Sequence, residues 1–92
     1  MIEKETSEER YNRLKRERVK LMRALEVYTE IIEMVIKHHQ YHADSALYTV
    51  ETEKALALLN ELRYKTSAEL IIVKLKLGRM LYQFKKFSDS VD

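Results

Sequence analysis

The sequence contains no cysteine, no proline, no tryptophan and a single glycine, Gly78, in 92 residues. Without cysteine the chain has neither disulfide bonds nor a thiolate metal site, so nothing in it points to secretion. Without proline, and with one glycine, it has few residues that interrupt helices or shape tight turns. These absences favour long, uninterrupted helices.

The residues that are present agree with this interpretation. Hydrophobic residues make up 46% of the chain and charged residues 35%, which is too apolar for a disordered segment. The length predicts a single helical domain over residues 1–92. The most apolar stretch, residues 70–81, contains three basic side chains and falls short of the roughly 20 residues that span a bilayer. The acidic start does not resemble a secretory signal peptide, so we expect a soluble, cytoplasmic protein without a transmembrane segment.

A first helix is predicted over about residues 7–43. Thr6 and Glu9 have the spacing of a capping box, in which the threonine side chain accepts a hydrogen bond from the amide three residues on. From there a 3,4-spaced seam of core-facing residues begins, and Met22, Ile31 and Ile36 are expected to widen it. The seam runs through Tyr11, Leu14, Arg18, Leu21, Leu25, Tyr28, Ile32, Val35, His39 and His42.

A turn is predicted over about residues 44–49, where Asp44, Ser45 and Thr49 are candidate N-caps. The second helical arm then covers about residues 50–87, with a possible break at 65–67 because Thr66 and Glu69 form another capping-box pattern. Its seam keeps the heptad phase through that point, which favours one continuous arm. This second seam runs through Leu56, Leu59, Arg63, Thr66, Leu70, Val73, Leu77, Met80, Phe84, Phe87 and Val91.

A β-hairpin is the alternative for residues 70–87. The stretch also alternates apolar and polar residues with period 2, and Gly78 followed by Arg79 suits a type II′ turn. Short apolar runs are ambiguous by periodicity alone, so this alternative stays open at the level of the sequence.

Charge is distributed in blocks although the net charge is only +2. Residues 10–23 carry seven basic side chains against one acidic, a net charge of +6, and residues 63–86 do the same. Residues 26–61 carry two basic against seven acidic side chains, a net charge of −5. Folded as a hairpin, the chain becomes a rod with both basic blocks at its open end and the acidic block around the turn.

The second arm is apolar on more than one side, and two helices cannot cover all of it. The predicted fold is therefore all-α: a long antiparallel helical hairpin, with three helices if the arm breaks, that completes a four-helix bundle by dimerisation. Two hairpins packed antiparallel would set basic ends against acidic turns, and a larger protein partner would serve equally. The residues expected to contact the partner lie off the seam: Leu58, Leu62, Ile72, Leu75 and Leu81.

These features predict a small protein–protein interaction module: an adaptor, a regulator or inhibitor, or an assembly component. The charged contacts expected on the first helix are Arg13, Arg16, Lys20 and Arg23. The alternative is a nucleic-acid-binding regulator that uses the basic blocks 10–23 and 63–86. No nucleophile–base pair, glycine-rich phosphate loop or metal triad is visible, so neither catalysis nor a cofactor is expected.

All three histidines lie just before the predicted turn. His38 and His42 are four residues apart, on one helical face, and this spacing can chelate a divalent metal if Asp44, Glu51 or Glu53 completes the site. His39 and His42 also continue the core seam. Three interpretations therefore stand: structural histidines, which the seam favours, a pH-responsive interface, or a metal site.

Overall fold

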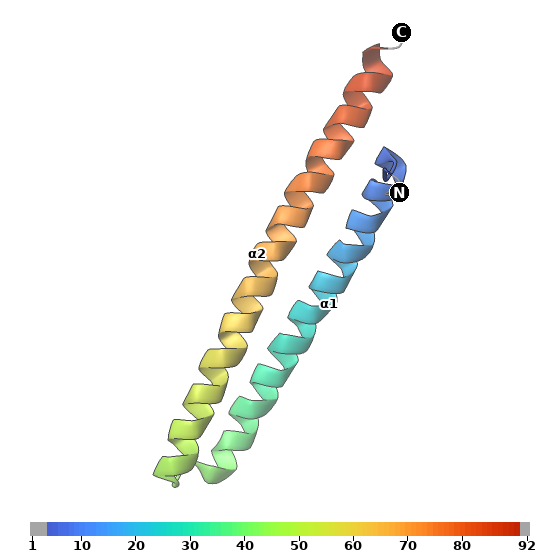
Figure 1. Ribbon diagram of the computed structural model, residues 1–92. Coiled ribbons are helices and arrows are strands. Elements are labelled where there is room, and N and C mark those ends of the chain that lie inside the picture. Colours follow the sequence, from blue (N-terminus) through green and yellow to red (C-terminus); the bar gives the residue numbers. More distant parts are fainter. Residues whose placement is uncertain (1–3, 91–92) are drawn as a thin grey trace.

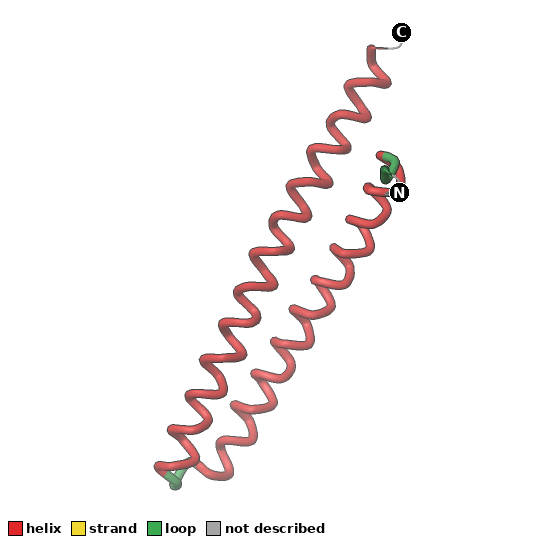
Figure 2. Tube along the Cα trace, in the orientation of Figure 1, coloured by secondary structure: helices red, strands yellow, loops and turns green. Residues whose placement is uncertain are grey.

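The chain folds into two long antiparallel helices that pack side by side (Figure 1). The computed structural model describes residues 4–90, with side chains for residues 4–86. Helix α1 spans Ser7–His39, the 3₁₀ turn η1 spans Gln40–His42, and helix α2 spans Ala46–Ser90. The described residues contain no strand, and α2 continues past the start of α1 (Figure 2). The predicted all-α helical hairpin is confirmed.

A side-chain oxygen caps the N-terminus of each helix. Thr6 Oγ1 accepts a hydrogen bond from the Glu9 amide at 3.1 Å, as the capping-box pattern predicts. Ser45 Oγ accepts one from the Tyr48 amide at 3.2 Å, so Ser45 caps α2. The predicted turn at 44–49 was therefore placed too late. Thr49 lies in the first turn of α2, where its hydroxyl donates to the Ser45 carbonyl at 3.0 Å.

Helix α2 runs without interruption through residues 65–67 and through 70–87. The break and the β-hairpin were both wrong, because Leu70, Val73 and Leu77 recur at helical spacing and are buried against α1. Thr66 is half-buried inside the helix and caps nothing. Gly78 is accommodated on an exposed side of the helix, where an added Cβ would meet no atom within 4 Å.

The core follows the two predicted seams. Every seam residue with a described side chain is buried or half-buried except Phe84, which is 40% exposed; Phe87 and Val91 lie outside the described side chains. The Phe84 ring still packs edge-on against Tyr11, with ring centroids 5.7 Å apart. The expected widening of the first seam was wrong, because two helices touch along one narrow line. The residues left exposed are Met22, Ile31 and Ile36.

Burial is uneven along the rod. Within residues 4–86, the buried side chains are Leu14, Leu70, Val73 and Leu77, which are 2–7% exposed and all lie nearer the chain ends than the turn. We call residues 24–63, which surround the turn, the tip half, and the remainder the open half. No side chain of the tip half is fully buried. The tip half therefore lacks a closed hydrophobic core of its own.

The hairpin is extended and leaves much of its surface uncovered. Its radius of gyration is 20.5 Å, whereas a compact domain of this length has about 12 Å. Its accessible surface is 8059 Å², against about 5,600 Å² for a compact monomer of this mass. No helix within residues 4–90 combines the length and apolar character that crossing a bilayer requires.

Candidate interaction surface

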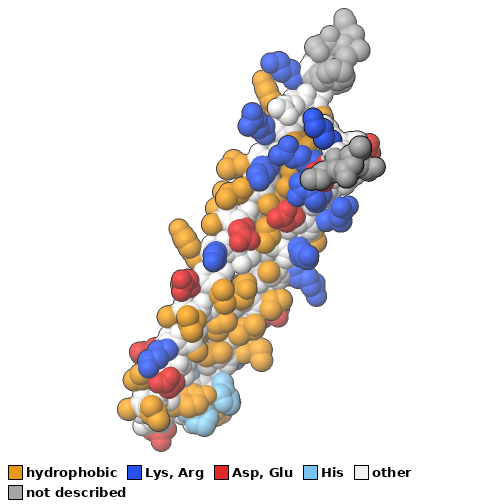
Figure 3. All heavy atoms as spheres, viewed as in Figure 1, with side chains coloured by type: hydrophobic (Ala, Val, Ile, Leu, Met, Phe, Trp, Pro, Cys, Tyr) orange, Lys and Arg blue, Asp and Glu red, His pale blue; other side chains and the backbone are white. Residues whose placement is uncertain are grey.

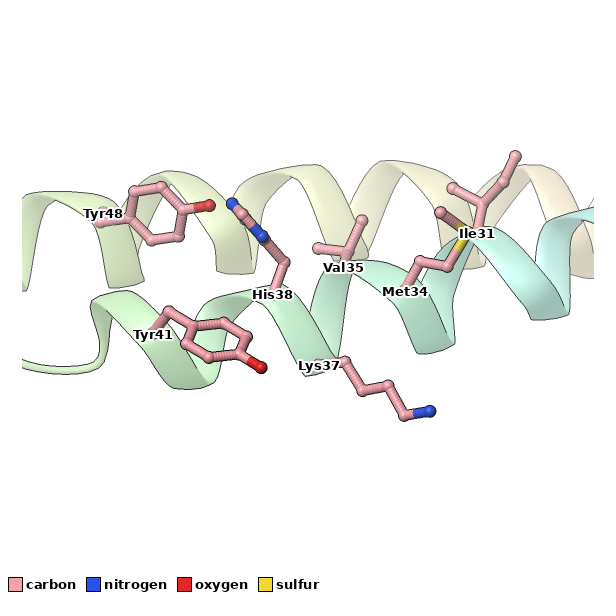
Figure 4. Close-up of a pocket in the computed structure, with 7 residues that line it drawn as sticks. All are labelled: Ile31, Met34, Val35, Lys37, His38, Tyr41 and Tyr48. Atoms are coloured by element: carbon pink, nitrogen blue, oxygen red, sulfur yellow. The ribbon is translucent and has the colours of Figure 1, made fainter.

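A mostly apolar groove of about 530 Å³ lies at the tip (Figure 4). Tyr48 comes from α2, Tyr41 comes from the 3₁₀ turn η1, and the other lining residues come from α1. Figure 4 shows His38 and Val35 directed toward α2, whereas Lys37 extends away from it. Lys37 is the only lining residue that carries a fixed charge. The groove is lined by Ile31, Met34, Val35, Lys37, His38, Tyr41 and Tyr48.

The three histidines gather around the Tyr48 ring. The centroid of that ring lies 4.4 Å from that of His42, 6.1 Å from His39 and 6.3 Å from His38. His39 Nε2 lies 2.9 Å from Thr49 Oγ1. The Thr49 hydroxyl also lies 3.0 Å from the Ser45 carbonyl oxygen, so it contacts both His39 and Ser45. The contact between His39 and Thr49 thus connects the end of α1 to the start of α2.

His38 and His42 do lie on one face, with ring centroids 5.1 Å apart. Across the part of the chain that the structure describes, however, no group of three or more histidine or carboxylate side chains is placed to hold a metal ion. The two imidazoles instead pack against each other and against Tyr48. The structural interpretation accounts for these contacts, and the pH-responsive interface stays a hypothesis.

A second recess, of about 360 Å³, lies at the open end, where the two basic blocks meet. Arg10 of α1 and Lys76 and Arg79 of α2 line it, together with Met80 and Gln83. The prediction that the hairpin brings both basic blocks to the open end is thus confirmed in detail. Three cationic side chains from two helices converge there, and no acidic residue lines the recess.

The tip groove and the basic recess lie on the same face of the hairpin. Residues seven apart recur on one side of a helix that packs with heptad phase. On α1, steps of seven lead from His38 in the groove to Arg10 in the recess through Ile31, Ala24 and Glu17. On α2 they lead from Tyr48 in the groove to Lys76 and Gln83 in the recess through Ala55, Leu62 and Glu69.

This common face changes character along the rod, as Figure 3 shows. Hydrophobic side chains gather over both helices toward the turn, and basic side chains gather toward the chain ends. We define the tip face as the exposed apolar residues of the tip half on this side. Their exposed fractions range from 37% for Ile31 to 80% for Tyr41. They are Val27, Ile31 and Met34 on α1, Tyr41 in η1, and Leu58 and Leu62 on α2.

The structure separates the five residues that the sequence proposed for partner contact. All five are exposed. Leu58 and Leu62 belong to the tip face, and Ile72, two heptads after Leu58, lies on the same side in the open half. Leu75 and Leu81 point in other directions around α2, so they do not extend this surface.

Sequence reasoning missed the α1 contribution to this face. Ile31 had been assigned to the core, and Val27, Met34 and Tyr41 had not been singled out. Those three residues are seven apart, and this spacing was a usable signal that they share one helical face. The sequence alone could not show which side of α2 lies next to these residues.

The four predicted charged contacts also lie together. Arg13, Arg16, Lys20 and Arg23 line one groove on α1 with Glu17, Val19 and Leu21. Arg13 is engaged within the chain: its Nε donates to Glu5 Oε2 at 2.9 Å, and its Nη1 lies 3.8 Å from Glu17 Oε2. The hydrogen bond from Arg13 lowers the pKa of Glu5 below its ordinary value, and the same bond raises the pKa of Arg13. Arg13 therefore stabilises the start of α1.

No protein-family model matches this sequence, and neither a curated protein nor a solved structure matches the chain.

Proposed function

We propose that this protein acts by binding another protein through its apolar helix faces, as an adaptor, a regulator or inhibitor, or an assembly component. The tip face is the observation that carries the proposal. Six apolar side chains, each at least 37% exposed, lie side by side over a half of the hairpin that has no fully buried residue. Contiguous apolar surface of this kind is typical of binding sites.

The energetics favour a covered tip face. Removing apolar surface from water contributes about 25 cal/mol per Å², so an exposed groove lined by large side chains is a strong driving force for association. Aromatic and methionine side chains are enriched in protein interfaces, and the groove contains Met34, Tyr41 and Tyr48. A four-helix bundle formed by dimerisation, or a complex with a larger protein, would bury them.

A pair of matched substitutions tests the proposal. Leu58→Asp places a charge in the tip face, whereas Leu47→Asp places one at an exposed leucine outside it; the two side chains are 63% and 72% exposed. We expect mass-resolved sizing and pull-down from the source to show association that Leu58→Asp abolishes and Leu47→Asp retains. A protein that stays monomeric and captures no partner contradicts the proposal, as does equal behaviour of the two variants.

Nucleic-acid binding is the second candidate, and the basic recess favours it. Arg10, Lys76 and Arg79 converge from both helices without an acidic neighbour in the lining. Phosphate contacts by such side chains weaken steeply with salt, with a slope of about −0.9 per neutralised phosphate on duplex DNA. Arg79→Gln should then reduce both the affinity and the salt slope, and Lys54→Gln at the tip should change neither. An affinity that does not respond to salt excludes this candidate.

A further inference from the structure

The tip face and the basic recess constrain which partner fits and how it lies. The face is apolar over the tip half, mixed at Glu17 and Glu69, and basic at the recess. A partner that covered its whole length would need an apolar half and an acidic half in matching order. A partner that covered only the tip half would need an apolar surface of the same size.

We propose that the partner is a second copy of this chain, packed antiparallel and overlapping only through the tip halves and the residues that directly adjoin them. The two tip faces then form a short four-helix segment, and the basic open ends project in opposite directions. This inference rests on the proposed function and specifies the partner. It also replaces full-length antiparallel overlap as the geometry of the dimer.

Full overlap conflicts with the distribution of side chains on this face. It would place the tip groove of one copy against Arg10, Lys76 and Arg79 of the other. Pressing cationic side chains onto an apolar groove removes their hydration, and on this side of the tip half Glu51 is the one acidic side chain that could pair with the three cations. A parallel pair of hairpins would bring the two basic ends together, and charges of one sign would repel.

Overlap of the tip halves instead packs the apolar side chains around Ile31 and Leu58 of one copy against the same side chains of the other. The open-end contacts place Leu14 between Val73 and Leu77, and counting along both helices from there sets Ile31 level with Leu58. A two-fold axis through that level stacks α1 on α1 and α2 on α2, each pair antiparallel. Ile31 and Leu58 then meet their own copies, and His38 meets the small side chain of Ala24, seven residues before Ile31.

The same axis produces charge complementarity on α2. Glu51 lies seven residues before Leu58 and Lys65 seven residues after it, so the three share one side of the helix. Antiparallel stacking about Leu58 places Glu51 of each copy opposite Lys65 of the other, giving two symmetric ion pairs at the rim. On α1 the acidic residues of the tip half fall outside the heptad rows of Ile31 and Met34, so they stay in solvent. They are Glu26, Glu30 and Glu33.

The area available is sufficient for a stable dimer. At ~1.5 Å per residue, the overlap about Ile31 covers about 36 Å of rod, and two helices are about 20 Å wide, so each copy offers about 700 Å². Stable interfaces bury about 600–1,000 Å² per partner, a range that includes this area. The exposed surface of 8059 Å² exceeds that of a compact monomer of this mass by more than this amount.

Small-angle scattering combined with light scattering tests the geometry. One hairpin is 71 Å long, so the proposed dimer has a maximum dimension of about 105 Å, given a rise of ~1.5 Å per residue in the overlap. We expect a particle of twice the chain mass with that dimension. A dimer hardly longer than 71 Å would mean full overlap and would overturn the inference.

A charge swap tests the register. Lys65→Glu sets two like charges opposite each other at both rims. We therefore expect the dissociation constant of the dimer to rise about tenfold, which corresponds to about 1.4 kcal/mol. Adding Glu51→Lys to the same chain should restore the affinity, because the pair is then reversed. Circular dichroism of both variants checks that the helices are intact. Absence of rescue overturns the register.

A cross-link supplies an independent readout, since the chain has no cysteine of its own. Leu58→Cys should be joined rapidly to its own copy by a short bismaleimide, and Leu47→Cys should react far more slowly. A wild-type protein that remains monomeric also overturns this inference. In that case pull-down with Leu58→Asp and Leu47→Asp still decides the proposed function, so the two failures are distinguishable.

Discussion

At the scale of single residues, the junction between the helices depends on a few oxygen atoms. Ser45 accepts from the Tyr48 amide, and Thr49 connects the Ser45 carbonyl to His39. The sequence named Asp44, Ser45 and Thr49 as equal cap candidates. It could not rank them, because the choice depends on how the 3₁₀ turn at Gln40–His42 directs the chain into α2.

Replacing the cap should destabilise the hairpin measurably. Ser45→Ala leaves the Tyr48 amide without its partner and is expected to lower the free energy of unfolding by about 1 kcal/mol. Asp44→Ala is the matched control and should have a smaller effect, since the cap bond comes from Ser45. Urea denaturation followed by circular dichroism measures both. Equal losses would show that Ser45 is not the functional cap.

The Glu5–Arg13 pair predicts a defined pH response. Hydrogen bonding to Arg13 lowers the pKa of Glu5 in the folded state below its ordinary value of 4.5. Its stabilising effect is therefore complete above that ordinary value and is lost as the pH falls through the lower folded value.

Carbon-detected NMR titration of the carboxyl groups checks this response. We expect the Glu5 midpoint to rise toward 4.5 when Arg13→Gln removes the donor. In the wild-type chain, the protection factors of the amides in the first turn of α1, which compare the exchange rate with that of an unfolded peptide at the same pH, should fall at acid pH. A Glu5 midpoint that Arg13→Gln leaves unchanged contradicts the assignment.

At the scale of elements, heptad phase determined most of what the sequence could predict. The two seams and the continuity of α2 through Thr66 follow from residues recurring at 3,4 spacing, and the antiparallel pairing follows from the short connection between the helices. The end of α1 at His39 does not follow, because the seam continues to His42 while the backbone already tightens into a 3₁₀ turn. Periodicity describes which side chains face the core but not where backbone hydrogen bonding changes.

The buried and exposed leucines of α2 should respond very differently to truncation. Leu77 is 3% exposed and packs with Leu14 and Val73, whereas Leu75, two residues earlier, is 68% exposed. Leu77→Ala is expected to cost about 2–4 kcal/mol through lost burial and an unfilled space. Leu75→Ala should cost less than about 0.5 kcal/mol. Thermal and urea denaturation compare them, and similar losses would contradict the packing of α2 on α1.

At the scale of the whole molecule, the two ends of the rod differ in burial and in charge. The open half contains the buried core and the basic recess, whereas the tip half has apolar surface without a core. The charge blocks were readable in the sequence and predicted which end is basic. The tip face could not be predicted from the sequence. Its prediction requires knowing that the side of α1 with Ile31 lies next to the side of α2 with Leu62.

Association through the tip face predicts that stability depends on concentration. If the tip half completes its core with a second copy, a tenfold increase in protein concentration should raise the unfolding midpoint by a few degrees. The Leu58→Asp variant should have a lower midpoint that does not change with concentration. Calorimetry at several concentrations measures this, and a wild-type midpoint independent of concentration would argue against self-association.

The placement of the buried core also determines how the chain reaches this fold. Leu14 and Leu77 meet from near opposite ends of the sequence, so their contact closes a very long loop and requires a large loss of chain entropy. The contacts around the turn close short loops but bury no side chain fully. Folding is then expected to start at the turn with weak contacts and to become committed only when the two far ends meet. Because the buried residues all lie away from the turn, a chain cut between Ala43 and Ser45 keeps their contacts, and its two helices should reassemble as separate fragments.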